Sequence, residues 1–254
     1  MPSKARKAAN AQKSGGNLKT FYSVLGGIAV LGVVAIAWAT MKPKTGATEP
    51  IQLTEQQLKD PKALVQAAHA ISLGPENAPV RILVFSDFTC PACRHYATNV
   101  EPNLKKEFVE PGKVQIKYYD FPLGGEGEHK WSFLAGRAGR CMAEQNKFWE
   151  FHDALFRNQA TWAYVSKAPN DSFEKYVTEV GGDANAFKAC LNSDKYADVI
   201  SATHALGQSL GVGGTPTLFM NGRQLAEEWG DYGKLKARLQ LELGPSAPAT
   251  TTAQ

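Results

Sequence analysis

The chain has 254 residues, 43% of them hydrophobic, which is enough for one globular domain with a full core plus an appendage. Its net charge of +4 depends on five basic residues in the first twenty positions, where no acidic residue occurs: Lys4, Arg6, Lys7, Lys13 and Lys19. Without these five, 23 basic residues stand against 24 acidic ones. A body so close to neutral argues against a nucleic-acid partner, which requires a basic surface on the folded part.

The uncharged segment Phe21–Met41 predicts a transmembrane helix. As a helix it would extend about 31 Å, the thickness of the hydrocarbon core of a bilayer. Because positive charges stay on the cytoplasmic side, we expect a basic cytoplasmic tail at 1–20, a single-pass signal-anchor at 21–41, and export of everything after residue 42. The alternative is a cleaved signal peptide, since Ala37-Trp38-Ala39 fits a cleavage pattern. In both cases the folded part lies in an oxidising extracytoplasmic compartment such as the periplasm.

Residues 42–69 predict a linker with short helices. Positions 42–50 carry Pro, Gly and Thr without periodic apolar residues, and Thr54 with Gln57 forms a capping-box pattern. The segment 244–254 has a similar composition and predicts a disordered tail.

The residues between 70 and 243 predict one α/β domain with a helical insertion. Its first part has the length of a βαβ unit with parallel strands: a hydrophobic strand at 80–85, a helix from 91 to about 109 that Pro102 kinks or interrupts, and an alternating strand at 114–119. Apolar positions then recur with helical spacing from about 129 to 210. The β pattern returns at 217–220, turns at Asn221-Gly222, resumes at 223–225, and precedes a last helix at 232–241.

Two of the four cysteines, Cys90 and Cys93, stand three residues apart at the predicted start of the first helix. Pro91 suits the first helical position, where a missing N–H costs nothing, so Cys90 is the expected N-cap and Cys93 lies one turn further on. The unpaired N–H groups and the positive end of the helix dipole stabilise a Cys90 thiolate and lower its pKa. A thiolate that attacks and a second thiol that resolves the mixed disulfide are the minimum requirement for thiol–disulfide exchange.

Two other interpretations of this pair stay open at this stage. The cysteines could be half of a zinc site completed by Cys141, Cys190 or a histidine, although the chain has no second C-x-x-C pattern and His95 has the wrong spacing. They could also form an inert disulfide, although so short a loop constrains the unfolded chain little. We expect no metal and no cofactor.

The stretch FSDFTCPAC (85–93), after a strand, and the stretch GTPTLF (214–219), after the helical insertion, together resemble the DsbA-like branch of the thioredoxin superfamily. Members of that branch are extracytoplasmic thiol–disulfide oxidoreductases, often tethered to the membrane in bacteria. The likeness covers about residues 70–243. It implies a thioredoxin fold with an all-helical insertion at about 129–210, here preceded by one N-terminal transmembrane helix.

By this resemblance, Cys90 is the nucleophile, Cys93 is the resolving thiol, and Pro216 matches the cis-proline of the family. A cis bond there would turn the backbone of Thr215 outward, where it can pair with an extended substrate strand. The alternative for Thr215-Pro216 is an ordinary loop.

One position departs from the pattern of many thioredoxin-like proteins, which carry a buried acidic residue six positions before the first cysteine. This chain has Val84 there. Asp87 is either a substitute for that acid or a capping or loop residue. Thr89 and His95 are the other candidates for tuning the thiolate, and the alternative for His95 is a solvated histidine.

The remaining cysteines, Cys141 and Cys190, lie 49 residues apart on apolar helical faces of the insertion. In an exported domain we predict that they form a structural disulfide, worth about 2–4 kcal/mol. The alternative is two separate buried thiols.

The sequence therefore predicts an enzyme, a membrane-tethered protein disulfide oxidoreductase whose leading function is to oxidise cysteines of exported client proteins. By family likeness, a membrane quinone reductase of the DsbB-like or vitamin K epoxide reductase-like type would reoxidise Cys90 and Cys93. The same site would also suit a disulfide reductase or isomerase. A function of a different class is a non-catalytic binding module in which the C-x-x-C is structural.

Overall fold

The computed structural model of the chain describes residues 48, 52–54, 58–125 and 127–244. The predicted cytoplasmic tail (1–20), the predicted signal-anchor (21–41), most of the predicted linker before residue 58 and the tail beyond residue 244 lie outside the described residues. Within the described ranges, no helix combines the length and the hydropathy needed to cross a membrane.

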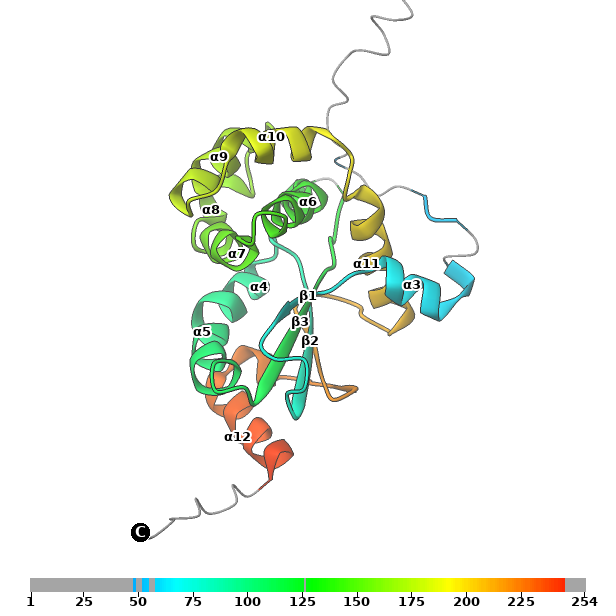
Figure 1. Cartoon of the computed structure of the whole chain (residues 1–254), viewed down its shortest axis with the longest axis vertical. Coiled ribbons are helices and arrows are strands. Elements are labelled where there is room, and N and C mark those ends of the chain that lie inside the picture. Colours follow the sequence, from blue (N-terminus) through cyan, green and yellow to red (C-terminus); the bar gives the residue numbers. More distant parts are fainter. Residues whose placement is uncertain (1–47, 49–51, 55–57, 126, 245–254) are drawn as a thin grey trace, which may run out of the picture. The chain divides into compact units, whose positions relative to one another are not determined.

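A five-stranded sheet forms the centre of the described domain (Figure 1). Its strands are β1 (Ile71–Leu73), β2 (Val80–Ser86), β3 (Val114–Asp120), β4 (Thr217–Met220) and β5 (Arg223–Gln224). They lie in the order β1-β3-β2-β4-β5. Strands β2 and β3 are parallel, which confirms the predicted βαβ unit, and β4 is antiparallel to β2. The predicted turn joins β4 to β5 through Asn221 and Gly222, whose φ angles of 47° and 82° are those that a two-residue hairpin turn requires.

Strand β3 differs from its prediction, because alternation in the sequence predicts only one buried face. Six of its seven residues are buried, since both faces of the sheet are covered. Tyr118 belongs to the main core, whereas its neighbour Tyr119 belongs to a second core. Even Gln115 is buried, and its Oε1 accepts a hydrogen bond from Nε of Arg81 at 3.2 Å. The antiparallel partner β1 is missing from the prediction because three residues are too short to show a pattern.

The second core is covered by α3 (Pro61–Ala67) and α11 (Ala197–Ser209), which contact each other. Helix α3 begins at a regular N-cap, where the carboxylate of Asp60 accepts from the N–H of Lys62 at 2.9 Å. The ring of Phe85 stacks on that of Tyr119 with centroids 5.0 Å apart. These contacts bury the sheet face that does not carry the main core.

The helix after β2 is one continuous helical run from Pro91 to Val109, and Pro102 does not interrupt it. The run consists of α4 (Pro91–His95), η1 (Tyr96–Val100), α5 (Glu101–Leu104) and η2 (Lys105–Val109). In η1 and η2 the turns are wider than in an α-helix, and the N–H of Glu101 bonds to the carbonyl of Tyr96, five residues back. A wider turn accommodates the proline ring, which would clash with the carbonyl four residues back in a regular helix. In place of the predicted kink or interruption, the helix therefore has wider turns on both sides of Pro102.

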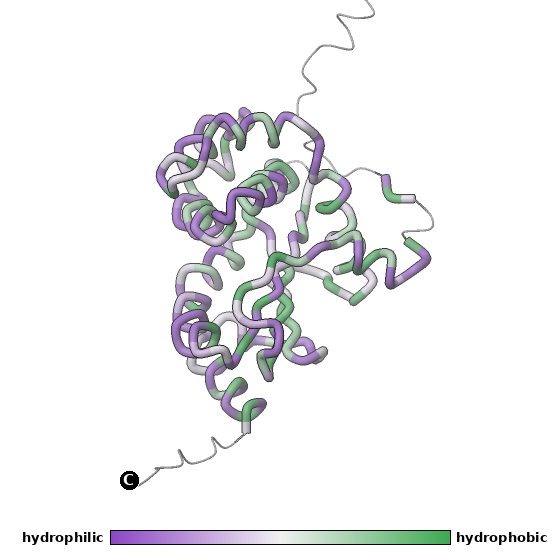
Figure 2. The backbone as a smooth tube through the Cα atoms, viewed as in Figure 1, coloured by the Kyte–Doolittle hydropathy of each residue, from purple (hydrophilic) through white to green (hydrophobic). Residues whose placement is uncertain are grey.

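The predicted helical insertion between β3 and β4 is confirmed. Figure 1 shows its helices from α6 to α10 grouped at one end of the sheet, while α11 returns the chain beside α3. In the same view, Figure 2 shows hydrophobic and hydrophilic residues recurring along the outer helices, and the hydrophobic runs of the sheet belong to β2 and β4. The elements from the insertion onward are η3 (Gly127–His129), α6 (Ser132–Ala143), α7 (Phe148–Arg157), α8 (Gln159–Trp162), α9 (Asn170–Glu179), α10 (Ala184–Asn192), α11, η4 (Glu228–Gly230) and the last helix α12 (Tyr232–Leu243).

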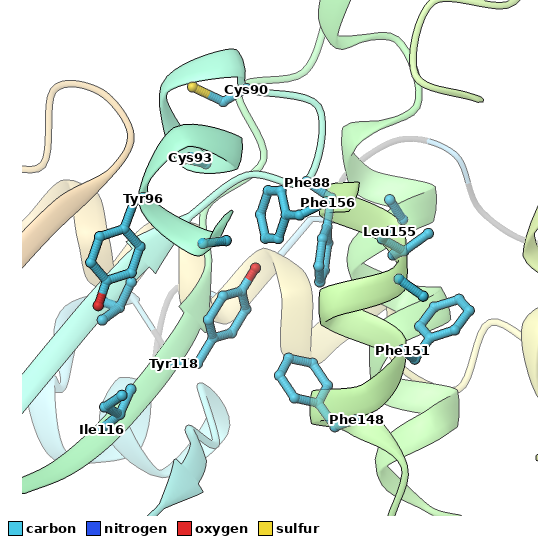
Figure 3. Packing of buried hydrophobic residues seen from close by; sticks show 14 of the residues in the cluster. Phe88, Cys90, Cys93, Tyr96, Ile116, Tyr118, Phe148, Phe151, Leu155 and Phe156 are labelled. Carbon is cyan, nitrogen blue, oxygen red and sulfur yellow. The ribbon is translucent and has the colours of Figure 1, made fainter. Parts of the chain in front are cut away.

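The main core extends from the sheet into the insertion through Phe88, which lies two residues before Cys90. Its ring centroid is 5.9 Å from that of Tyr118 on β3 and 5.0 Å from that of Phe156 on α7. Figure 3 shows these rings as one layer beneath Cys90 and Cys93. Packing of the insertion therefore fixes the segment that carries the cysteines.

Candidate active site

Cys90 and Cys93 lie at the start of the helical run that follows β2. Cys90 is the N-cap residue of α4, and its carbonyl accepts from the N–H of Arg94 at 3.0 Å. Cys90 is 6% exposed, whereas Cys93 is fully buried. Figure 3 shows the Cys90 sulfur pointing away from the layer of buried rings. This is the placement that the spacing of the two cysteines predicts.

The loop before β4 brings the second motif to the same place. The Thr215–Pro216 peptide bond is cis. The thiol of Cys90 donates to the carbonyl oxygen of Thr215, with Sγ and O 3.3 Å apart, although the residues are separated by 125 positions. The hydroxyl of Thr217 donates to the carbonyl of Gly214 at 2.8 Å and closes the loop. Backbone groups of this loop therefore border the Cys90 sulfur.

The surroundings of Cys90 lower the pKa of its thiol to about 6. A hydrogen bond from the thiol of Cys93 contributes most, burial acts in the opposite direction, and the side chain of Thr215 and the backbone N–H groups of Cys93 and Ala92 contribute to the lowering. In the described part of the chain, the buried hydroxyl of Thr215 has no other hydrogen-bond partner, so it is free to donate to the thiolate. At neutral pH, Cys90 is therefore mainly a thiolate.

The surroundings of Cys93 act in the opposite direction. Burial raises the pKa of its thiol well above the usual range, and the hydrogen bond to Cys90 and the charge on Cys90 raise it further. Val84, at the position of the family's buried acid, is 1% exposed and belongs to the core. No carboxylate therefore stands at that position to take the Cys93 proton, and Cys93 stays a thiol that donates to its neighbour.

Asp87 holds the turn between β2 and α4, and is 2% exposed. Its Oδ1 accepts from the N–H of Thr89 at 2.7 Å and from the Thr89 hydroxyl at 2.8 Å. Its Oδ2 accepts from the N–H of Leu123 and from the hydroxyl of Ser132, each at 2.8 Å. The backbone N–H of Asp87 is directed at Sγ of Cys93, 3.5 Å away. Of its two predicted interpretations, the geometry favours the loop residue, because the carboxylate fixes the backbone on both sides of the cysteines.

His95, a predicted tuning residue, has both ring nitrogens next to groups other than the cysteines. Its Nε2 lies 2.9 Å from the carbonyl oxygen of Gly230, and its Nδ1 lies 3.1 Å from Nδ2 of Asn99. Both ring nitrogens are thus engaged with η4 and with the next turn of the helix, rather than with a sulfur. We therefore do not assign His95 to the active site.

Three residues of the insertion that sequence reasoning missed lie against the cysteine motif. Nε2 of the buried Gln159 donates to the carbonyl oxygens of Phe88 and Cys90, each at 2.9 Å. The hydroxyl of Tyr164 donates to the carbonyl of Thr89 at 3.4 Å. Nδ1 of His129 lies 2.8 Å from the Thr89 hydroxyl. These contacts span 40 to 75 positions, and no local pattern marks the residues in the sequence.

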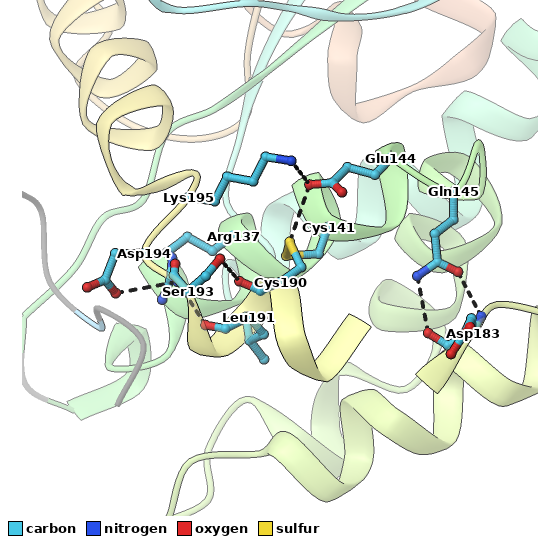
Figure 4. Close-up of a disulfide and its surroundings, with 10 residues drawn as sticks. All are labelled: Arg137, Cys141, Glu144, Gln145, Asp183, Cys190, Leu191, Ser193, Asp194 and Lys195. Carbon is cyan, nitrogen blue, oxygen red and sulfur yellow. Dashed lines mark hydrogen bonds and ion pairs between the residues drawn. A yellow bond between two sulfur atoms is a disulfide. The ribbon is translucent and has the colours of Figure 1, made fainter. Parts of the chain in front are cut away.

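Cys141 and Cys190 form a disulfide between α6 and α10 (Figure 4). An ion pair between Lys195 and Glu144, 2.8 Å apart, lies beside it. On α6, the guanidinium of Arg137 donates to the carbonyl of Leu191 at 2.8 Å. Because these two cysteines bind each other, they are not available to complete a zinc site with Cys90 and Cys93.

Among the described residues, Glu101, His152 and Asp153 have ligand atoms within 4.8 Å of one another and form a geometrically possible metal site. However, Nζ of Lys105 lies 3.3 Å from Oδ1 of Asp153 and 3.8 Å from Oε1 of Glu101. The ammonium of Lys105 therefore already pairs with both carboxylates, and we assign the group to an ion-pair network between the helical run and α7.

The geometry supplies what thiol–disulfide exchange requires. A low-pKa sulfur borders an accessible backbone loop, and a buried second thiol lies within hydrogen-bond reach of it.

Comparisons with known proteins agree with this chemistry. A family model described as thioredoxin matches residues 66–237. The probable disulfide bond formation protein D of Bacillus cereus is 35% identical over 178 residues, covering 68% of this chain and 78% of that protein. The crystal structure of oxidised BdbD from Bacillus subtilis has a TM-score of 0.61 at 23% identity, covering 70% of this chain and 94% of that one. Alpha-DsbA1 of Wolbachia pipientis has a TM-score of 0.59 at 20% identity, covering 69% and 91%. This chain therefore belongs to the DsbA-like branch of the thioredoxin family and is a protein disulfide oxidoreductase.

Proposed function

We propose that this protein oxidises paired cysteines of exported client proteins, with Cys90 as the sulfur that the client attacks and Cys93 as the resolving thiol. The observation that carries the proposal is the contrast between the two cysteines. The pKa of Cys90 is lowered to about 6, whereas burial raises that of Cys93. A stabilised Cys90 thiolate favours the reduced protein, and a favoured reduced form makes the Cys90–Cys93 disulfide a strong oxidant.

The reaction has two exchange steps. A client thiolate attacks Sγ of Cys90, the Cys90–Cys93 bond breaks, and Cys93 leaves with the electron pair and takes up a proton. The second client thiolate then attacks the client sulfur of the mixed disulfide, and Cys90 leaves as a thiolate. Departure of Cys90 is favourable because a thiol of low pKa is a good leaving group.

The backbone of Thr215 orients the client. When Cys90 is protonated, its thiol donates to the carbonyl of Thr215, with Sγ and O 3.3 Å apart. When Cys90 is a thiolate or part of a disulfide it has no proton to donate, and this carbonyl is available to an N–H of an extended client segment. The cis-proline Pro216 holds the loop with this carbonyl beside the sulfur.

We place this catalytic domain, residues 70–243, outside the cytoplasm. The proposed order is a cytoplasmic tail (1–20), a signal-anchor (21–41), a linker with short helices (42–69), the catalytic domain and a disordered tail (244–254). The signal-anchor is supported by the 21 uncharged residues of the segment 21–41 and by the basic residues before it. The extracytoplasmic location of the catalytic domain is supported by the bacterial relatives named disulfide bond formation protein D. A membrane quinone reductase of the DsbB-like or vitamin K epoxide reductase-like type then removes the electrons from Cys90 and Cys93.

The test is the oxidation of a reduced, unfolded client protein with two cysteines by stoichiometric oxidised protein. We expect the client disulfide to form within seconds to minutes. Reduced Cys93→Ser mixed with a client that already carries a disulfide should trap a mixed disulfide, because the Cys90 thiolate attacks the client disulfide and no Cys93 thiol is present to release it. Cys90→Ser should abolish the reaction. If the wild-type protein instead reduces an oxidised client and leaves the reduced one unchanged, the protein is a reductase and the proposed direction is wrong.

A further inference from the structure

A hydrogen-bonded chain runs from the buried carboxylate of Asp87 to an imidazole at the protein surface. Oδ1 of Asp87 accepts from the hydroxyl of Thr89 at 2.8 Å, and that hydroxyl lies 2.8 Å from Nδ1 of His129. Oδ2 of Asp87 lies 3.7 Å from the same nitrogen. Asp87 and Thr89 are buried, whereas the side chain of His129 is 27% exposed. The inner end of the chain is therefore fixed, and its outer end reaches solvent.

The direction of the hydrogen bonds determines which ring nitrogen of His129 is basic. A carboxylate only accepts, and Asp87 receives four hydrogen bonds. The hydrogen of the Thr89 hydroxyl is therefore directed at Asp87, and the hydroxyl oxygen remains as an acceptor. Nδ1 of His129 must then carry the ring proton and donate it, which leaves the lone pair on Nε2.

His129 stands at the rim of the cysteine site. Its hydrogen-bond partner Thr89 directly precedes Cys90 in the chain. The hydroxyl of Tyr164 donates to the carbonyl of Thr89. Burial raises the pKa of that phenol most, and the nearby charges of Glu128 and Cys90 raise it further. The loop that carries His129 and the reactive sulfur thus border one patch of surface. Among the described residues, the charged and titratable groups near the imidazole are Glu128 and Lys130 on its own loop, Asp87, Tyr164 and Cys90.

We propose that His129 is a general base that removes the proton from the attacking client thiol, and that Thr89 and Asp87 are positioning residues that hold its ring. This inference rests on the proposed function. A client thiol with an ordinary pKa of about 8.5 is only a few per cent thiolate at neutral pH. Neither Val84 nor the Pro91-Ala92 dipeptide offers a base to such a thiol, whereas Nε2 of His129 does.

In the proposed step, the client S–H proton passes to Nε2 of His129 while the client sulfur bonds to Sγ of Cys90. The Cys90–Cys93 bond breaks and its electron pair goes to Cys93. Over both exchange steps the client loses two electrons and two protons, and the cysteine pair gains both electrons. Cys93 retains one proton, and the other passes from His129 to water because Cys90 remains a thiolate.

The experiment uses His129→Asn in the full chain, because the Asn amide can still donate to Thr89 but cannot take up a proton. The rate of oxidation of a two-cysteine peptide is measured from pH 6 to 9.5. We expect about a tenfold loss near pH 7 that disappears above the pKa of the peptide thiols, since those thiols then ionise without help. Thr89→Val should show the same pH-dependent loss, and Thr89→Ser, which keeps the hydroxyl, should restore the rate.

Two controls distinguish a general base from a non-specific effect of replacing a histidine and from an effect on the ionisation of Cys90. His95→Asn replaces a histidine on α4 whose ring bonds to Gly230, and should leave the oxidation rate unchanged at every pH. Alkylation of reduced Cys90 by iodoacetamide involves no client thiol, so His129→Asn should leave its rate and pH midpoint unchanged. A loss that is equal at all pH values, no loss at pH 7, or a shifted alkylation midpoint overturns the proposal. If the wild-type protein fails to oxidise the peptide, the proposed function itself has failed.

Discussion

Sγ of Cys90 lies 3.3 Å from the carbonyl oxygen of Thr215, so residues 125 positions apart form one reactive surface. The contact requires the helical run to begin at Cys90, and it requires β4 to pair with β2 so that its preceding loop reaches the start of that helix. A single sulfur thereby meets a helix start, a second thiol and a segment of backbone suited to a client strand.

The first prediction concerns the ionisation of Cys90. Reduced protein should react with iodoacetamide at one rapid site, with a midpoint near pH 6, because hydrogen bonds from Cys93, Thr215 and the helix start stabilise the thiolate. Cys90→Ser should remove the rapid reaction, since burial leaves Cys93 as an unreactive thiol. A midpoint near pH 8.5 in the wild-type protein would show that the thiolate is not stabilised.

The second prediction links that ionisation to folding. Between pH 6 and about 8.5 the unfolded chain holds the Cys90 proton and the folded chain does not, so the free energy of unfolding of the reduced protein should rise with pH. The expected rise at this site is about 2–4 kcal/mol, and it is lost as the pH falls through 6. Denaturant unfolding of reduced wild type and reduced Cys90→Ser at several pH values measures it. If the free energy of unfolding rises equally with pH in both proteins, the pKa of Cys90 is not lowered by folding.

The third prediction concerns Gln159, whose amide donates to the carbonyls of Phe88 and Cys90. Gln159→Leu leaves two buried carbonyls without that donor, which should lower the free energy of unfolding by about 1–3 kcal/mol. The matched control is Gln208→Leu at an exposed position of α11, expected within about 0.5 kcal/mol of wild type. Urea unfolding compares them, and indistinguishable stabilities would mean that Gln159 does not hold the motif.

The fourth prediction concerns the disulfide between Cys141 and Cys190, which closes a loop of 49 residues within the insertion. Replacing both cysteines by serine should lower the free energy of unfolding by about 2–4 kcal/mol, because the unfolded chain regains conformational freedom. Client oxidation at a temperature where the variant is folded should stay within twofold of wild type. A folded variant without activity would mean that this disulfide takes part in the transfer of electrons from the client.

Much of the fold follows from local pattern in the sequence. A hydrophobic run predicts the strand at 80–85, alternation predicts its partner at 114–119, and helical spacing predicts the long insertion; the structure extends each strand by one residue. The three-residue strand β1 was not, because its pairing with β3 is a tertiary property. The widened turns around Pro102 also depend on how the helical run packs, and a proline in the sequence predicts only some disturbance.

The residues of the active site likewise form two groups, those that a local motif indicates and those that only the fold brings to the cysteines. Cys90, Cys93, Thr215 and Pro216 carry local motifs, so the sequence indicates them. Gln159, Tyr164 and His129 reach the motif from loops and helices of the insertion, and nothing next to them in the chain distinguishes them from ordinary polar residues.

One alternative interpretation of the sequence is wrong. A non-catalytic binding module does not agree with membership of the DsbA-like branch, whose disulfide bond formation relative is 35% identical over 178 residues.

The direction of electron flow is tested most directly by the reduction potential of the Cys90–Cys93 pair, obtained from equilibrium with glutathione buffers of known ratio. We expect a strongly oxidising value, near −120 mV, because the stabilised Cys90 thiolate lowers the free energy of the reduced form. A value near −270 mV, typical of a disulfide reductase, would contradict it.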